Sequence, residues 1–186
     1  MSESPPAMVT AQAYQRLEDP RNGRWTLTRG VLAIQPWPGL LHGSVHGHMA
    51  SRLIERVDLK RWHVVNVGCI THRDPDTVRQ IEVALYSRER VRGRRCPVTD
   101  YPTVGPELAF EIVDVADTPQ SVLEKVSDLL AAGTDQIFVL DPARRTAVLY
   151  HPNDEPTFLR EEDALALPAP LDGWMPTVAE LLSEGH

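Results

Sequence analysis

The pattern of apolar and polar positions predicts a chain in which strands alternate with a few amphipathic helices. Strands are expected where apolar residues alternate or run together, at residues 61–70, 78–86, 108–115, 137–140 and 146–150, with a strand or hairpin at 157–167. Helices are expected where apolar residues recur every three to four positions, at 7–17, from 44 onward, between 118 and 133, and near 178–182. A β-hairpin is expected at 25–35, with its turn at 28–30.

The middle of the chain gives the clearest local prediction, a strand–helix–strand unit. Residues 108–115 form a nearly continuous apolar run, which is typical of a strand covered on both faces. Thr118 and Pro119 then supply an N-cap and a first-turn proline, and Gly133 is placed to end the helix. Residues 137–140 follow as a second buried strand. A unit of this length favours two parallel neighbouring strands, and hence an α/β fold with a mixed sheet.

Length and composition are ordinary for one globular domain. The chain has 186 residues, of which 42% are hydrophobic and 24% charged, so we expect a single domain over 1–186 with residues 1–6 frayed. The formal net charge is -7, so any contact with nucleic acid requires a local basic patch. Neither a signal peptide nor an apolar stretch of ~18 residues is present, and we expect a cytoplasmic protein that does not span a membrane.

Two glutamates fall inside expected strands. Glu111 interrupts the buried run, where a carboxylate costs several kcal/mol unless it is paired, protonated or bound to a metal. Glu82 lies in the strand at 78–86, where regular alternation places residues 79, 81, 83 and 85 on one face and Glu82 on the other. Two carboxylates ~4 Å apart repel by about 4 kcal/mol at an effective dielectric of ~20. An oxygen-preferring cation such as Mg²⁺ or Mn²⁺ removes that repulsion.

Lys125 is the third residue of interest, because it lies at the edge of the apolar stripe of its helix and not on the solvent face. From there its ammonium group can reach the C-terminal end of the Glu111 strand, where it would orient a water molecule and stabilise charge on a phosphoryl oxygen. The alternative is a structural ion pair between Glu111 and Lys125, with Glu82 solvated at a sheet edge.

The segment 88–103 is rich in arginine and has two interpretations. It is either a solvated, mobile loop or a basic lip that binds an anionic substrate, since arginine contacts to phosphate dominate nucleic-acid affinity. The arginines concerned are Arg88, Arg90, Arg92, Arg94 and Arg95.

His42 and His46 have the i, i+4 spacing with which two helical histidines can chelate a transition metal. No zincin-type glutamate accompanies them, and Gly43 and Gly47 weaken a helix there, so a role at the helix entry or the rim of a site is favoured over zinc. Glycine-rich phosphate loops and serine nucleophile elbows are absent from the sequence.

Several segments together resemble the Uma2 family of restriction-endonuclease-like proteins, which have the PD-(D/E)XK nuclease fold. The segment 24–32, RWTLTRGVL, is similar to the family's "RYELIDGEL" hairpin, and His42 with the following helix to its "PH" segment. The segment 79–85 stands where "RRPDVAVV" is expected, and 108–113 where "LVVEVLS" is. The closing "K…Y…GV.EYWLVDP" pattern is matched by Lys125, Gly133 and residues 137–142.

The resemblance implies a restriction-endonuclease-like core with flanking helices and an N-terminal β-hairpin. It also implies a metal-dependent nuclease that uses Mg²⁺ or Mn²⁺, acts on nucleic acid, DNA in the first instance, and forms a homodimer. Glu82 would replace the motif aspartate, and Glu111 would be the second acid. The usual motif lysine falls at Val113, so Lys125 would supply the amine from the helix.

The sequence departs from the family pattern at four positions. The acid of "YEL" is Thr26, the acid after the hairpin glycine is Val31, the proline of "PD" is Ile81, and the aspartate is Glu82. Glutamate carries its oxygens about an ångström further out, a displacement that can cost on the order of 10²-fold in rate. Two alternatives therefore stay open: a catalytically degenerate protein that binds DNA or a partner protein, and a purely structural or dimerising protein.

Overall fold

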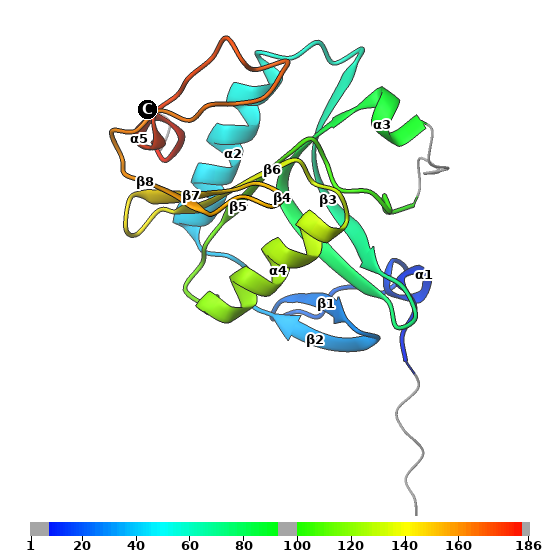
Figure 1. Cartoon of the computed structure of the whole chain (residues 1–186). Helices are drawn as coiled ribbons and strands as arrows, with labels where there is room; N and C mark the ends of the chain where they lie inside the picture. Colours follow the sequence, from blue (N-terminus) through cyan, green and yellow to red (C-terminus); the bar gives the residue numbers. More distant parts are fainter. Residues whose placement is uncertain (1–7, 93–99, 184–186) are drawn as a thin grey trace, which may run out of the picture.

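The computed structural model describes residues 8–92 and 100–183, and in this part of the chain the strands form one eight-stranded sheet (Figure 1). The strand order is β2-β1-β4-β5-β6-β7-β8, and β3 pairs with β4. The strands are β1 (Arg24–Thr28), β2 (Val31–Gln35), β3 (Trp62–His72), β4 (Thr77–Ser87), β5 (Leu108–Ile112), β6 (Gln136–Asp141), β7 (Thr146–Tyr150) and β8 (Thr157–Leu159). All pairs are antiparallel except β5 with β6, so the sheet is mixed, as predicted.

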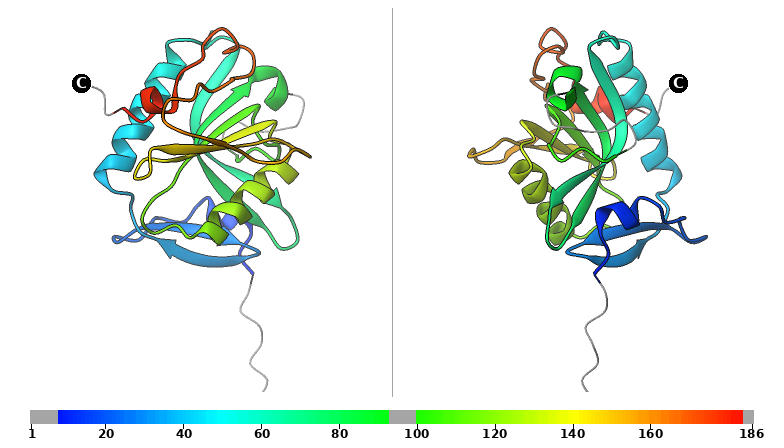
Figure 2. Two further views of the ribbon diagram at one scale, coloured as in Figure 1. Left: turned by 60° about the vertical axis from the view of Figure 1, so that its left-hand side comes forward. Right: turned by 90° about the vertical axis from the view of Figure 1, so that its right-hand side faces the viewer.

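Two long helices cover opposite faces of the sheet, as the edge-on view in Figure 2 shows. The helices are α1 (Ala11–Tyr14), α2 (Leu40–Ile54), α3 (Arg88–Arg92), α4 (Pro119–Ala131) and α5 (Val178–Leu181). Apolar side chains of α2 and α5 pack with Phe110 and Phe138 in one core, whereas Val126 and Leu129 of α4 pack with Ala109 in a second core. No described helix is long and apolar enough to cross a membrane.

The strand–helix–strand unit predicted in the middle of the chain is confirmed. The side chain of Thr118 accepts from the backbone N–H of Ser121 and completes a capping box, with Pro119 at the first helical position. Gly133 then turns the chain with a φ of +91°, a conformation that favours glycine. β6 returns parallel to β5, with Phe110 opposite Phe138.

Some element boundaries differ from those that the pattern predicts. The first helix is only one turn long, and residues 88–92 form the short helix α3 at the start of the expected loop. α2 begins at Leu40 and continues through Gly43 and Gly47, because burial of its inner face offsets a cost of ~1 kcal/mol per glycine. β5 ends at Ile112, since Asp114 starts a tight turn in which its N–H donates to Asp117.

β4 contains a bulge at Glu82. Val65 of β3 pairs with Ala84, and Val67 pairs with Ile81, so one residue of β3 faces two residues of β4 between these pairs. An extra residue of this kind interrupts the ladder and reverses the alternation of side chains.

The bulge overturns one prediction about β4. Regular alternation would place Arg79, Ile81, Val83 and Leu85 on one face, yet Ile81 packs in the core under α4 while Val83 and Leu85 pack in the core under α2. The prediction is wrong because the additional residue at Glu82 shifts the following side chains by one position.

Candidate active site

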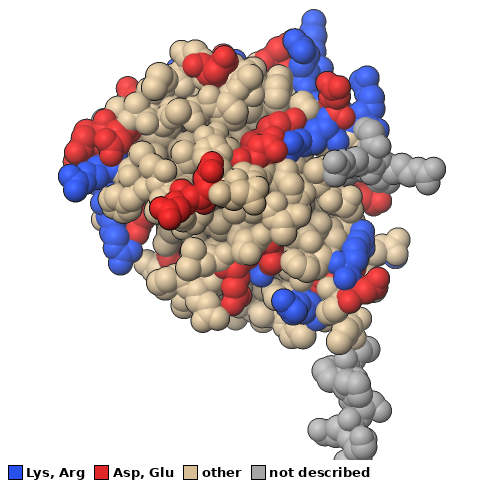
Figure 3. Space-filling model, viewed as in Figure 1, with Lys and Arg blue, Asp and Glu red and all other residues tan. Residues whose placement is uncertain are grey.

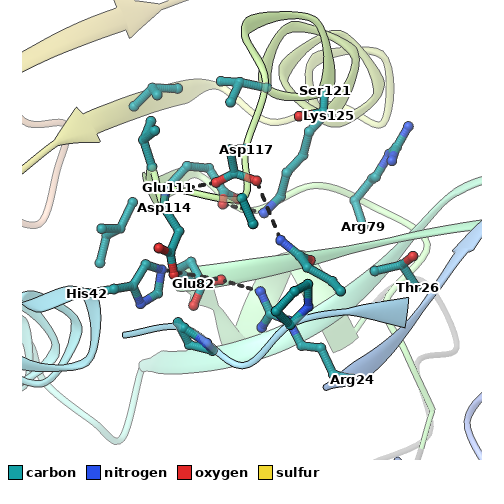
Figure 4. A pocket seen from close by; sticks show the side chains of 18 of the residues that line it. Arg24, Thr26, His42, Arg79, Glu82, Glu111, Asp114, Asp117, Ser121 and Lys125 are labelled. Carbon is teal, nitrogen blue, oxygen red and sulfur yellow. Dashed lines mark hydrogen bonds and ion pairs between the residues drawn. The ribbon is translucent and has the colours of Figure 1, made fainter. Parts of the chain in front are cut away.

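The sheet divides at the middle of β4. β3 runs along one edge of β4, while on the other edge β5 pairs with residues 83–85 and β1 pairs only with Val78. Residues 79–82 therefore have no described strand beside them on that edge. A cavity of about 300 Å³ opens at this fork, and residues of β1, β2, the start of α2, the end of β5 and the first turns of α4 line it (Figure 4).

The fork brings Glu82 and Glu111 together. Val83 and Phe110 form the last pair of the β4–β5 ladder, so Glu82 and Glu111 are the adjacent residues of the two strands where these diverge. Both glutamates line the cavity, and each is only 5% exposed. Lys125 projects from α4 into the same cavity and donates a hydrogen bond to Glu111 Oε2 (Figure 4). The three residues singled out from the sequence thus form one cluster.

The carboxylate of Glu82 is bound mainly by arginine. Nη2 of Arg24 donates to Oε1 over 3.0 Å, and Nε2 of His42 lies 3.9 Å from the same oxygen. Asn66 donates to Oε2 over 3.4 Å. His42 is itself buried, so the structure places it in the wall of the cavity and not on a solvent-exposed rim.

The backbone of Glu82 is held by side chains in place of a strand partner. Its carbonyl oxygen accepts from His46 Nε2 over 2.9 Å and from Asn66 Nδ2 over 3.0 Å. A carbonyl can only accept, so Nε2 of His46 carries the proton. His42 and His46 therefore both support one residue of β4, and within the described residues no group of three or more His, Cys, Asp or Glu is arranged to hold a metal by itself.

The two carboxylates have pKa values shifted in opposite directions. Burial raises the pKa of Glu111 to about 7; the charge and hydrogen bond of Lys125 oppose this rise, and the charge of Glu82 adds to it. Burial also acts to raise the pKa of Glu82, but the positive charges of Lys125 and Arg24, the Arg24 hydrogen bond and His42 outweigh it, so this pKa is lowered. Carboxyl pairs whose pKa values are driven apart in a cleft are typical of catalytic sites.

Buried polar atoms without a partner concentrate at this cavity. Among the described residues, five buried side-chain atoms lack a hydrogen-bond partner, and three of these are Arg24 Nε, His42 Nδ1 and Glu111 Oε1. Leaving such groups unsatisfied costs about 1–3 kcal/mol each. A ligand with both an anionic and a cationic part would satisfy the arginine donor and the glutamate acceptor.

A magnesium or manganese ion fits the donor set. Mg²⁺ is usually bound through one or two carboxylates, with water and substrate phosphate completing its shell. Glu82 and Glu111 supply two carboxylates, and Oε1 of Glu111 is free of a protein donor.

Two aspartates hold the mouth of the cavity together. Asp114 accepts from the backbone N–H of Gly39 over 3.3 Å, and Asp117 accepts from the side chain of Gln35 over 3.4 Å. These contacts tie the β5–α4 loop to the connection between β2 and α2. Neither the aspartates nor Arg24 was predicted as a site residue, although Arg24 begins the hairpin segment that resembles the family motif.

The described arginines of the segment 88–103 lie away from this cavity. β4 and β5 are antiparallel, so α3 at the end of β4 is at the opposite end of β5 from Glu111. Arg88, Arg90 and Arg92 do not line the cavity, and Arg94 and Arg95 fall outside the described residues. In Figure 3 basic side chains gather near α3, with acidic side chains among them.

Comparisons with known proteins identify the family and the fold. The sequence model of the Uma2 family, described as "Putative restriction endonuclease", matches residues 11–179. The fold is similar to a crystal structure from Anabaena variabilis described as a "putative nuclease belonging to DUF820", with a TM-score of 0.76, 18% identity and coverage of 95% of this chain and 98% of that chain. At that identity the likeness shows the fold alone, and it confirms the predicted fold class. No curated protein matches the chain.

Proposed function

Because the chain belongs to the Uma2 family, we propose that it is a nuclease that hydrolyses phosphodiester bonds of nucleic acid with the help of Mg²⁺ or Mn²⁺. The family description supports nuclease activity in general. The observation that carries the metal-dependent mechanism is the convergence of Glu82, Glu111 and Lys125 at the fork, with one oxygen of Glu111 buried and without a donor.

In this proposal Glu82 and Glu111 hold the divalent ion. When bound, such an ion supplies Lewis-acid stabilisation of phosphoryl oxygens and lowers the pKa of a coordinated water. Lys125 is held by Oε2 of Glu111, and its remaining N–H groups can orient the attacking water or donate to a phosphoryl oxygen. The lowered pKa of Glu82 keeps that carboxylate ionised and ready to bind a cation.

The departures from the family pattern are consistent with this assignment. The hydroxyl of Thr26 donates to the carbonyl of Ala33 across the hairpin, so this position supplies no carboxylate. Val113 lines the cavity where the usual motif lysine would stand, and the amine comes from α4. Glu82 is longer than the usual aspartate, but the bulge at this residue alters where its side chain starts.

A second candidate function is favoured by the ion pairs of the site. Arg24 and Lys125 already neutralise the two carboxylates without any metal. A catalytically degenerate protein that binds DNA or a partner protein would keep this arrangement and would have no need of a divalent ion. Action on DNA, a homodimer, a single domain and a cytoplasmic location stay predictions.

The test is a cleavage assay of wild type and Glu111→Gln on plasmid and oligonucleotide substrates, DNA and RNA, with Mg²⁺ or Mn²⁺. The amide keeps an acceptor for Lys125 but loses the charge, so we expect activity to fall at least ~10²-fold with folding intact. Glu107→Gln is the matched control, because Glu107 stands just before β5 at the end remote from the fork, where it pairs with Arg90. Equal activity of wild type and Glu111→Gln would contradict the proposal.

A further inference from the structure

Arg24 binds the carboxylate of Glu82, which a divalent cation would also bind. Its Nη2 binds Oε1 of Glu82, and its positive charge lowers the pKa values of both Glu82 and Glu111. With Lys125 it balances the two negative charges of the carboxylate pair (Figure 4). The carboxylate pair is thus charge-balanced by side chains of the protein, without a metal.

The two carboxylates differ in how available they are to an external cation. Among the described residues, Glu111 is bound through Oε2 by Lys125, and Oε1 has no hydrogen-bond partner. Glu82 has Oε1 bound by Arg24 and in ion-pair range of His42, and Oε2 accepts a longer bond from Asn66. A divalent cation that uses both glutamates must therefore compete with Arg24 for Glu82.

One N–H donor of Arg24, at Nε, is not used in the contact with Glu82. Its Nε is buried and has no acceptor in the part of the chain that the structure describes, although the residue lines the cavity and its side chain is 19% exposed. The N–H groups of a guanidinium form a planar fork that matches two oxygens of a phosphate. A phosphodiester in the cavity would give Nε its missing acceptor.

We propose that Arg24 is an exchangeable counter-ion: it occupies Glu82 in the metal-free protein and turns to the substrate phosphate when the divalent ion binds. This inference rests on the proposed nuclease function. Because phosphate draws Arg24 away from Glu82, the metal and the nucleic acid bind cooperatively. The metal alone binds weakly, because it must first displace an arginine that has no other acceptor.

The experiment is calorimetric titration of Mn²⁺ into wild type and Arg24→Met, with and without a short phosphorothioate oligonucleotide that is cleaved slowly. Methionine keeps the length of the side chain without its charge. We expect Arg24→Met to bind Mn²⁺ alone about 10-fold more tightly than wild type and to bind the oligonucleotide about 10-fold more weakly. The oligonucleotide should raise the Mn²⁺ affinity of wild type by a larger factor than that of Arg24→Met, because its phosphate can ligate the ion in both proteins but releases Glu82 from Arg24 only in wild type.

Arg90→Met is the matched control, because Arg90 has the same 19% exposure and also pairs with carboxylates, but at the other end of the sheet. Its Mn²⁺ affinity should equal that of wild type. Arg24→Lys keeps the charge without the fork, so it should bind Mn²⁺ as wild type does and bind the oligonucleotide more weakly. It also serves as the test variant if thermal unfolding shows that Arg24→Met is not folded.

The outcomes separate this inference from the proposed function. If wild type binds Mn²⁺ and Arg24→Met binds it no more tightly, the exchange is wrong and the nuclease proposal stands. If neither binds Mn²⁺, with or without the oligonucleotide, the metal-dependent mechanism and the exchange are both wrong.

Discussion

The two ends of the sheet each contain a half-buried arginine beside carboxylates, and they differ in how well these groups are satisfied. Near α3, Arg90 pairs with Glu107 and Asp135 and donates to the carbonyls of Gly105 and Gly133. At the fork, Arg24 has Glu82 as its acceptor and keeps a buried Nε without one. A complete network stabilises a fold, whereas an incomplete one at a cavity is what a ligand site requires.

The largest expected difference between the two ends is in catalysis. Lys125→Met should lower kcat about 10²–10³-fold, because it removes the only lysine ammonium at the cavity among the described residues. Lys60→Met, an exposed change near α3, is the matched control and should keep full activity. Steady-state cleavage rates check this, and equal rates for the two variants would place the chemistry away from the fork.

The next largest expected effect is a dependence of the free energy of unfolding on pH, caused by Glu111 at the fork. Glu111 has a folded pKa of about 7 against an ordinary 4.5, so the folded state binds this proton more tightly than the unfolded state does. The free energy of unfolding therefore falls as pH rises through the window from about 4.5 to about 7 and is constant above it. Glu82, whose pKa is lowered, acts in the opposite sense and only below about 4.5.

Glu111→Gln should remove that dependence. Denaturant unfolding is measured in the absence of metal. Between pH 5 and pH 8 the free energy of unfolding of the variant should rise by about 1–3 kcal/mol relative to that of wild type. All other titratable groups are common to both proteins, so their contributions cancel in the difference. Parallel pH profiles would mean that Glu111 is ionised throughout.

A smaller effect concerns the two arginines. Arg90→Met should lower the free energy of unfolding by about 1–2 kcal/mol, since it removes the arginine partner of two carboxylates and two carbonyls. Arg24→Met should lower the free energy of unfolding by about the same amount, because it leaves the buried carboxylate of Glu82 with the charge of Lys125 and the 3.4 Å bond from Asn66. Chemical denaturation at one pH measures both, and a larger loss for Arg24→Met would make its ion pair structural.

How much of this the sequence can predict depends on the range of the interactions. The unit from β5 to β6 is predictable because its apolar runs, the Thr118 cap and Gly133 act locally. Glu111 and Lys125 are predictable as candidates because a carboxylate in an apolar strand requires a partner. Membership of the family is predictable from the same motifs.

The remaining features depend on contacts between distant segments. The bulge at Glu82 arises from how β3 pairs with β4, and regular alternation within β4 carries no sign of it. Arg24 and Glu82 are 58 positions apart, so their pairing depends on where β1 leaves the edge of β4. Position in the sheet also separates the arginines of α3 from the cavity, although their charge alone suggested a substrate contact.

Glu82 and Glu111 are proposed to form a divalent-cation site, and Mn²⁺ titration of wild type and Glu111→Gln tests this without relying on activity. The titration is run at pH 8, above the pKa of Glu111, with the phosphorothioate oligonucleotide present and Glu107→Gln as the control. We expect wild type and Glu107→Gln to bind Mn²⁺ and Glu111→Gln to lose this binding. Identical binding curves for wild type and Glu111→Gln would contradict it.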